Sequence, residues 1–330
     1  MVRRRPTRKL IIAAECLEAK ALLSATVADG VLQIEGTDAD DVIRVGLHSE
    51  DETIVVARVN DDVFEFDRAD IESVVASGGA GADLIHVGKR VAVPAELDGG
   101  DGPDRLIGSV MNDTLLGGPG RDRISGGRGD DLIQGGAAND KMNGGSGSDT
   151  MFGAEGHDRM FGHHGGDLMF GGEGKDFMSG GRGDDVMAGQ AGNDAMSGDA
   201  GDDDMSGGEG NDRLFAGSGQ NLLFGGDGDD TLTGNTAEDI MDGGTGENEI
   251  RDSADRPGNG GNFNARMRAR SIFKRSDANK DKVLTSDEVD AERWAELTEF
   301  DADDSGDISL REFFEWFENR TGRGGEGDGE

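Results

Sequence analysis

The apolar residues of this chain follow three different periods along its length. Residues 26–98 contain short alternating and β-branched runs, which predict short strands. These runs lie at residues 31–34, 42–45, 53–59, 63–66 and 74–75. From residue 99 to residue 251 one apolar residue recurs every nine positions, with no insertion or deletion. Farther on, apolar residues three or four apart predict helices at residues 263–273, 288–297 and 310–317.

The nine-residue period defines seventeen consecutive units from Gly99 to Arg251. Glycine opens every unit except the one that begins at Ala216, and glycines recur at the second and fourth places. Tight turns need positive φ angles at such positions, which glycine adopts without steric cost. The eighth place is apolar in every unit, and its residues are Leu106, Leu115, Ile124, Ile133, Met142, Met151, Met160, Met169, Met178, Met187, Met196, Met205, Leu214, Leu223, Leu232, Met241 and Ile250. Each unit therefore predicts a six-residue turn and a very short strand, with two units in each coil.

The sixth place of the unit is aspartate in fifteen of the seventeen units, and only Asn221 and Asn248 depart. These residues are Asp104, Asp113, Asp122, Asp131, Asp140, Asp149, Asp158, Asp167, Asp176, Asp185, Asp194, Asp203, Asp212, Asp230 and Asp239. Stacked strands repeat at about 4.8 Å, so carboxylates on neighbouring turns come close enough to share a metal ion. Without metal they repel one another, and we expect the apo array to be largely unfolded.

Residues 126–134 and 225–233 match the pattern Gly-Gly-x-Gly-x-Asp-x-U-x, where U is a large apolar residue. The array closely resembles the RTX, or hemolysin-type, calcium-binding repeats. The resemblance implies a right-handed parallel β-roll, with calcium held between carbonyls and the aspartates of units two apart. Residues 36–44 and 78–86 look like degraded copies of the unit, so residues 26–98 are expected to cap or begin the same solenoid.

Two features of the array allow a second interpretation. The run of eight methionines from Met142 to Met205 could form a soft-metal site for copper, but inward-facing thioethers more often serve as adaptable packing. Phenylalanines at the ninth place could form an exposed strip for a partner, or could pack beneath a cap or tail. They are Phe152, Phe161, Phe170, Phe215 and Phe224. The packing interpretation is favoured for the methionines, and both stay open for the phenylalanines.

Two twelve-residue loops between the predicted C-terminal helices have the ligand spacing of EF-hands, with oxygens at places one, three, five, seven and twelve. The first loop supplies Asp277, Asn279, Asp281, the carbonyl of Val283, and Glu288. The second supplies Asp301, Asp303, Ser305, Asp307 and Glu312. Lys282 replaces the usual turn glycine in the first loop, whereas Gly306 keeps it in the second. The tandem pair resembles compact bacterial EF-hand pairs, which favours a buffer or structural role.

Composition fits a calcium-loaded repeat protein. The chain has 58 glycines and no tyrosine, so much of it cannot build an ordinary core of bulky side chains. Its formal net charge of -36 disfavours nucleic acid and anionic membranes as partners and favours cations. Composition alone would equally suit a disordered acidic chain, but the strict register of the units favours order. Cys16 is the only cysteine, which excludes an intrachain disulfide.

The N-terminal segment predicts export. A basic cluster of Arg3, Arg4, Arg5, Arg8 and Lys9 precedes the apolar run 10–14, as at the start of an export signal. Residues 17–25 resemble the LEPR-XLL leader-like motif of exported planctomycete-type proteins, with Ala19 and Lys20 in place of proline and arginine. The alternative is an ordinary amphipathic N-terminal helix. No apolar run reaches the roughly 20 residues that a spanning helix needs.

The domain organisation predicted is a leader-like segment (1–25), a β-rich cap (26–98), the nonapeptide array (99–251), a linker (252–262), an EF-hand pair (263–320) and a disordered acidic tail (321–330). No H-E-x-x-H or G-x-S-x-G motif occurs, so we expect no enzymatic activity. We expect a secreted or cell-surface bacterial protein that binds multiple calcium ions and contacts a surface protein or polysaccharide. The alternative is an RTX-associated secreted hydrolase or protease with an unrecognised site in residues 26–98.

Overall fold

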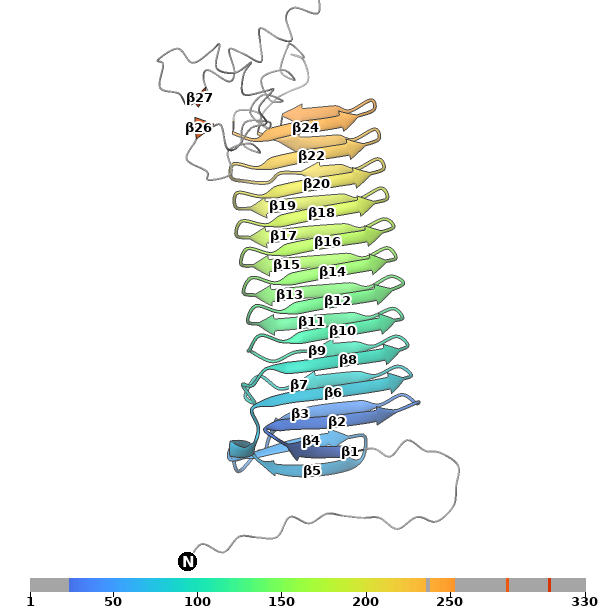
Figure 1. The fold of residues 1–330 in the computed structure, drawn as a ribbon, viewed down its shortest axis with the longest axis vertical. Coiled ribbons are helices and arrows are strands. Elements are labelled where there is room, and N and C mark those ends of the chain that lie inside the picture. Colours follow the sequence, from blue (N-terminus) through green and yellow to red (C-terminus); the bar gives the residue numbers. More distant parts are fainter. Residues whose placement is uncertain (1–23, 236–237, 253–282, 285–307, 310–330) are drawn as a thin grey trace, which may run out of the picture.

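The computed structural model describes residues 24–235, 238–252, 283–284 and 308–309. Between residues 24 and 252 the chain winds into a tall column in which two sheets face each other (Figure 1). The column rises from a small antiparallel cap at its N-terminal end to β24 at the other end (Figure 1). The expected mainly β solenoid is therefore confirmed.

Each sheet takes alternate strands from the chain. Sheet 1 contains, in spatial order, β1 (Ser24–Ala28), β2 (Val31–Thr37), β6 (Ser73–Ala80), β8 (Ala95–Asp101), β10 (Thr114–Pro119), β12 (Leu132–Ala137), β14 (Thr150–Glu155), β16 (Leu168–Glu173), β18 (Val186–Ala191), β20 (Asp204–Glu209), β22 (Leu222–Asp227) and β24 (Ile240–Thr245). Sheet 2 contains β25 (Glu249–Asp252), β23 (Thr231–Gly234), β21 (Arg213–Phe215), β19 (Ala195–Ala200), β17 (Phe177–Arg182), β15 (Arg159–His164), β13 (Lys141–Ser146), β11 (Arg123–Arg128), β9 (Arg105–Ile107), β7 (Leu84–Val87), β3 (Val42–Leu47), β4 (Ile54–Val59) and β5 (Asp62–Asp67).

Strands within the array pair in parallel with a constant offset of eighteen residues. In sheet 1, Leu115 lies opposite Ile133, and in sheet 2, Ile124 lies opposite Met142. One nonapeptide unit therefore supplies one strand, and the next unit crosses to the other sheet. The sequence-based prediction of two units per coil is confirmed.

The core between the two sheets consists of one row of side chains from each sheet. The eighth-place residues from Leu106 to Met241 are all buried, and Ile250 at the last strand is partly buried. The methionines from Met142 to Met205 occupy this interior row and pack in the same hydrophobic core as the leucines. Their position supports the packing interpretation, because a flexible thioether fills a narrow interior.

Glycines at the second and fourth places of the unit have positive φ, for example Gly100 at 90° and Gly102 at 129°. Six array units carry another residue at the second place, and four of these residues, Ala154, His163, Gln190 and Asp199, also keep a positive φ. This backbone conformation costs such residues on the order of 1 kcal/mol each. The strand register thus overrides local preference wherever the fourth-place glycine remains.

The cap shows how the solenoid begins. β1 and β2 form an antiparallel hairpin, and β3, β4 and β5 form an antiparallel meander that closes the end of sheet 2. β5 leads into a short 3₁₀ helix, η1 (Arg68–Asp70). Parallel pairing then starts with long coils: Leu32 lies opposite Val74, and Val74 opposite Ala95. The sequence separation between paired residues on neighbouring strands shortens from 42 to 21 and then to 18 residues, the value in the array. Residues 26–98 therefore begin the same solenoid.

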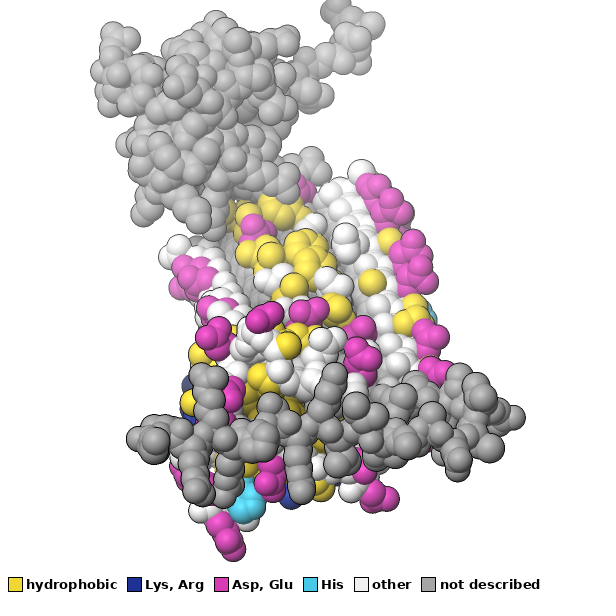
Figure 2. Space-filling view, turned by 60° about the horizontal axis from the view of Figure 1, so that its bottom comes forward, with side chains coloured by type: hydrophobic (Ala, Val, Ile, Leu, Met, Phe, Trp, Pro, Cys, Tyr) yellow, Lys and Arg dark blue, Asp and Glu magenta, His cyan; other side chains and the backbone are white. Residues whose placement is uncertain are grey.

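The outer surface carries acidic side chains along the edges where the turns lie. Exposed acids such as Asp130, Asp184 and Asp202 occupy the fifth place of their units. Figure 2 shows one face of the molecule, with hydrophobic side chains along its middle, acidic side chains along its margins and few Lys or Arg. In the described solenoid, the exposed acidic side chains therefore gather at the turns.

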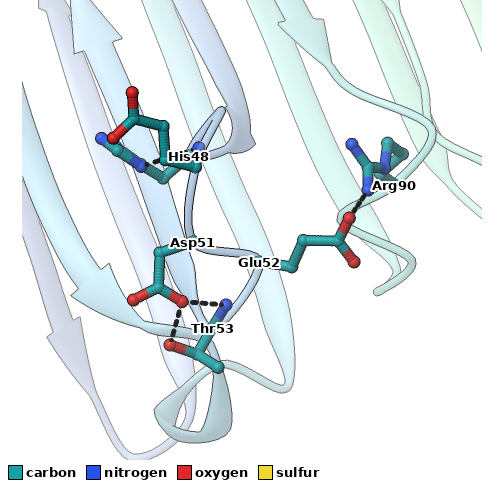
Figure 3. Close-up of polar contacts among 6 residues, drawn as sticks. His48, Asp51, Glu52, Thr53 and Arg90 are labelled. Carbon is teal, nitrogen blue, oxygen red and sulfur yellow. Dashed lines mark hydrogen bonds and ion pairs between the residues drawn. The ribbon is translucent and has the colours of Figure 1, made fainter.

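The loops of the cap are joined by short polar contacts (Figure 3). Arg90, in the loop after β7, forms an ion pair with Glu52, in the loop between β3 and β4. Asp51 accepts hydrogen bonds from the backbone N–H and the hydroxyl of Thr53, and these bonds lower the pKa of the Asp51 carboxyl. These contacts are exposed, so each contributes little to stability.

Two further strands lie near the C-terminus of the chain. β26 (Val283–Leu284) and β27 (Ile308–Ser309) pair antiparallel. Residues 1–23 of the predicted leader, the helices around the EF-hand loops, and the acidic tail lie outside the described residues, whereas Ser24 and Ala25 of the predicted leader begin β1. Within the described part of the chain, no helix is both long and apolar enough to cross a membrane.

Candidate metal centre

The sixth-place aspartates are buried, although each sits at the end of a surface turn. All fifteen that the sequence singled out have at most 3 % of their surface exposed, and so do Asp41 and Asp83 of the cap. Each residue ends the turn and directly precedes the strand that carries the buried eighth-place side chain. The backbone therefore aims the carboxylate inward, between successive turns.

The first carboxylate oxygen of each residue continues a ladder along the column. Except in Asp41 and Asp113, which begin the two ladders, Oδ1 accepts a hydrogen bond from the backbone N–H of the sixth-place residue one coil earlier, at 2.7–2.9 Å. One ladder runs through Asp41, Asp83, Asp104, Asp122, Asp140, Asp158, Asp176, Asp194, Asp212, Asp230 and Asn248. The other runs through Asp113, Asp131, Asp149, Asp167, Asp185, Asp203, Asn221 and Asp239. The two ladders lie along the two edges of the solenoid.

The second carboxylate oxygen, Oδ2, has no hydrogen-bond partner in fourteen of these aspartates, and it is fully buried in each. They are Asp83, Asp104, Asp122, Asp131, Asp140, Asp149, Asp158, Asp167, Asp176, Asp185, Asp194, Asp203, Asp212 and Asp230. A buried, uncompensated charge costs several kcal/mol. Fourteen of them would cost on the order of tens of kcal/mol, more than the roughly 5–15 kcal/mol of net stability that proteins have.

A small cradle lies beside each of these oxygens. A methyl group placed on Gly99, for example, would lie 2.5 Å from Asp104 Oδ2 and 2.7 Å from Gly117 O, one coil later. The same pair of oxygens flanks Gly135, at 2.5 Å for Asp140 Oδ2 and 3.0 Å for Gly153 O. Glycine at the first place therefore leaves a space lined by oxygens, into which no side chain projects.

This set of atoms fits calcium. Calcium prefers six to eight oxygen ligands and accepts irregular geometry, which suits carboxylate and main-chain carbonyl oxygens at the junction of two turns. The described residues contain no group of three or more His, Cys, Asp or Glu side chains able to hold a metal. Carbonyl oxygens must consequently supply most of the coordination, with one carboxylate for each turn. Softer metals that need nitrogen or sulfur ligands do not fit.

Burial raises the pKa of the ladder carboxyls in the absence of metal. The pKa rises to about 8 for Asp131, to about 7 for Asp140 and Asp185, and to about 6 for Asp104 and Asp122. Loss of solvent is the largest cause in each case, and neighbouring carboxylates of the ladder add to it for Asp131 and Asp140. Calcium must therefore displace protons from part of the array.

These pKa values predict that the calcium-free protein is more stable in acid. A carboxyl whose folded pKa is raised stabilises the fold below its unfolded pKa of about 4, and this contribution disappears as pH rises through 6 to 8. Metal-stripped protein should show a β-rich fold with a thermal melting transition at pH 5 and should lose most of that signal by pH 8, by circular dichroism. A melting temperature that rises with pH in metal-free buffer would contradict the assignment.

Three ladder aspartates differ, because both of their oxygens are hydrogen-bonded to the protein. Asp41 Oδ2 accepts from the N–H and hydroxyl of Thr37, and Asp113 Oδ2 accepts from the N–H of Ser109. Asp239 Oδ2 accepts from the N–H of Asn235 at 2.6 Å. In each case the donor is the second-place residue of the same unit. We call these three units the closed turns.

The closed turns share a sequence feature. Each has lost glycine at both the second and the fourth place: Thr37 with Ala39, Ser109 with Met111, and Asn235 with Ala237. Neither Thr37 nor Ser109 nor Asn235 has a positive φ, so the second N–H turns toward the carboxylate. Units that keep one of the two glycines, such as the one containing His163 and Gly165, retain an unpartnered Oδ2.

Sequence reasoning missed two parts of this arrangement. Asp83 lies in a unit that precedes the strict register, yet its Oδ2 is as buried and unpartnered as those in the array. A second, exposed ladder runs along the fifth place, where Asn112, Asp130, Asn139 and His157 each accept from the backbone N–H one coil later. The frequent Asn and Asp residues at the fifth place of the unit are the sequence feature that could have predicted this exposed ladder. The EF-hand ligands lie outside the described residues, except for the backbone of Val283.

Comparison with known proteins agrees with this geometry. The family model of the RTX calcium-binding nonapeptide repeat, which spans four copies of the unit, matches seven stretches. They cover residues 98–133, 116–151, 125–160, 143–178, 161–196, 179–214 and 215–250. No curated protein matches the chain. Residues 98–250 of this chain therefore match the RTX calcium-binding nonapeptide repeat and form a parallel β-solenoid.

Proposed function

We propose that the protein is an exported, calcium-stabilised structural or interaction protein whose repeat array folds when it binds calcium. The observation that carries this proposal is the row of fourteen buried Oδ2 atoms with no partner, each beside a carbonyl-lined space. A divalent ion at each space would compensate the buried charge. Right-handed winding is part of the proposal, because parallel crossovers are nearly always right-handed.

The ions are assigned to the open turns alone. The assignment covers thirteen of the fifteen aspartates that the sequence indicated, and it adds Asp83. Asp113 and Asp239 are left out, together with Asp41, because protein donors already satisfy both of their oxygens. The closed turns would then end the ladders without metal: Asp41 begins the first ladder, whereas Asp113 and Asp239 begin and end the second.

We also propose that residues 263–320 form an EF-hand pair. Support comes from β26 and β27, which join the two loops at Val283–Ser309 and Leu284–Ile308. Val283 and Leu284 are the seventh and eighth residues of the first loop, and Ile308 is the eighth of the second. A short antiparallel contact at these places would couple the two calcium sites.

Export would give the calcium requirement a purpose. Calcium is scarce inside the cell and plentiful outside, so the chain would stay unfolded until it leaves and would fold afterwards. The basic and apolar N-terminal segment supports this route. A binding role is preferred to an enzymatic one, because the array offers repeated structural sites and the sequence has no recognised catalytic motif.

Counting bound ions tests the proposal. Native mass spectrometry of the 34.6 kDa protein across a calcium titration should reveal many ions per chain, bound cooperatively, together with a gain of β-structure in circular dichroism. Magnesium should bind far less, because it demands near-octahedral geometry and retains its water. A chain that takes up no more than the two ions of an EF-hand pair would refute the assignment to the array.

Two variants locate the end of the first ladder. Asp83→Asn should lower the calcium count by about one ion, because the substitution removes the single carboxylate that serves its turn. Asp41→Asn, one coil away in the same ladder, should leave the count unchanged. Both counts come from native mass spectrometry at saturating calcium. Equal counts for the two variants would remove Asp83 from the set of ligands.

A further inference from the structure

Lysine and arginine are segregated onto one face of the solenoid. Residues 99–251 contain ten Lys and Arg residues, of which eight lie on strands of sheet 2 and none on strands of sheet 1. Strands β9, β11, β13, β15 and β17 contain no Asp or Glu. These five strands carry Arg105, Arg123, Arg128, Lys141, Arg159 and Arg182, all exposed. This part of the surface is basic in a chain whose net charge is -36.

Four of these residues form a column along the axis of the molecule. Arg105 lies opposite Arg123, Arg123 opposite Lys141, and Lys141 opposite Arg159. Neighbouring members are about 4.8 Å apart along the sheet, which is the strand spacing. Like charges placed directly opposite one another destabilise a sheet. Among the described residues none of the four takes part in an ion pair, so this basic column lacks an anionic partner within the solenoid.

The residues beside the basic column offer hydrogen bonds. Ser125 and Asn143 occupy the ninth place on β11 and β13, next to Arg123 and Lys141. Farther along, Phe161 lies under Lys141, whose Nζ is 5.5 Å from the ring centroid. The surface therefore combines a row of cations with hydroxyl and amide groups, and at its far end with the rings of Phe161 and Phe177, whose centroids are 5.7 Å apart. A polymer that carries regular negative charges and many hydroxyl groups would complement it.

We propose that the outer face of sheet 2, centred on the basic column, binds a linear anionic polysaccharide. The inference rests on the proposed function, because calcium controls the long-range field. Fourteen divalent ions would offset 28 of the 36 net negative charges, so a polyanion would approach the loaded protein with much less repulsion. Flat sheet geometry lets the polymer lie along the axis and meet one cation for each coil.

Nucleic acid fits this face less well. Single strands bind through aromatic platforms on which successive bases stack, whereas Ile107, Ser125 and Asn143 flank the first three cations of the column. Duplexes would bring their second backbone toward the acidic edges of the solenoid. Sulfated and carboxylated polysaccharides both carry regular negative charges that the column would recognise. The experiment below distinguishes these two classes of polysaccharide.

The test uses the full-length, calcium-loaded chain. Binding to dextran sulfate, hyaluronate, neutral dextran and oligo(dT) is measured by affinity electrophoresis, with ion counts from the same samples. The double variant R123Q/K141Q removes two cations of the column. Its matched control, R121Q/K175Q, removes one Arg and one Lys from fifth-place turn positions away from the strands. Circular dichroism confirms that all three proteins fold.

We expect wild type and R121Q/K175Q to bind dextran sulfate, hyaluronate or both. Neither protein should bind neutral dextran. R123Q/K141Q should bind the same anionic polysaccharide about tenfold more weakly, the loss expected for two exposed charge pairs. Equal losses in both variants, no binding by wild type, or tighter binding of oligo(dT) would overturn the proposal. If the wild-type ion count is normal in such a case, calcium binding stands and only the docking face fails.

Discussion

Stripping calcium at pH 8 is expected to abolish most of the β-sheet signal of the protein. Above pH 8 nearly all ladder carboxyls are ionised, and the buried Oδ2 atoms then have neither a proton nor a metal ion to compensate them. A single file of Leu, Ile and Met side chains is a thin core that cannot offset a penalty on the order of tens of kcal/mol. The apo chain should therefore unfold at room temperature.

Circular dichroism with and without EGTA, followed by thermal melts, measures this effect. Addition of calcium should restore the signal in a single cooperative transition, and an equal concentration of magnesium should restore little of it. Sodium chloride of matched ionic strength controls for simple screening of surface charge. If the metal-free protein at pH 8 keeps the β-signal of the loaded protein, the folding switch is ruled out.

Gly135→Ala should be among the most damaging single substitutions in the array. The new methyl group would lie 2.5 Å from Asp140 Oδ2 and 3.0 Å from Gly153 O, so it would occupy the space assigned to the ion. Gly135 does not have a positive φ, so backbone strain does not contribute. We expect the loss of about one bound ion and roughly 3 kcal/mol of unfolding free energy at saturating calcium, from overpacking and the lost site.

Urea unfolding at saturating calcium, with ion counting, checks this expectation. Gly46→Ala is the matched control, because nothing lies within 4 Å of the added carbon in β3. That control should keep the wild-type ion count and change stability by less than about 1 kcal/mol. If Gly135→Ala retains every ion, the first-place glycine is not the wall of the metal site.

The solenoid itself could be predicted from the sequence, because a strict repeat leaves few folds open. The nine-residue spacing fixed which side chains face inward, and the buried methionines from Met142 to Met205 occupy that row. The cap was harder to predict, since its coils are 42 and 21 residues long and interrupted by the β3–β5 meander. Asp83 was left out of the predicted ligands because its unit, residues 78–86, begins 21 residues before Gly99 and so lies outside the strict nine-residue register, although Asp83 holds the sixth place of that unit.

The identity of the sixth-place residue alone does not distinguish the open turns from the closed ones. Asp113 and Asp239 occupy the same place in the unit as Asp131, and their chemistry is identical. The difference arises from the backbone two to four residues earlier, where the loss of both glycines lets Ser109 or Asn235 donate its N–H to the carboxylate. Backbone direction depends on φ, which residue identity constrains only when both glycine positions are considered together.

Strand alternation between the two sheets has a consequence for how such a protein can change its length. Duplication of eighteen residues would add one complete coil, and every later strand would remain in its original sheet. Duplication of nine residues would preserve the repeat but exchange the sheets for all later strands. Cationic side chains would then move to the face that bears none. The array can therefore lengthen without exchanging its two faces only by two units at a time.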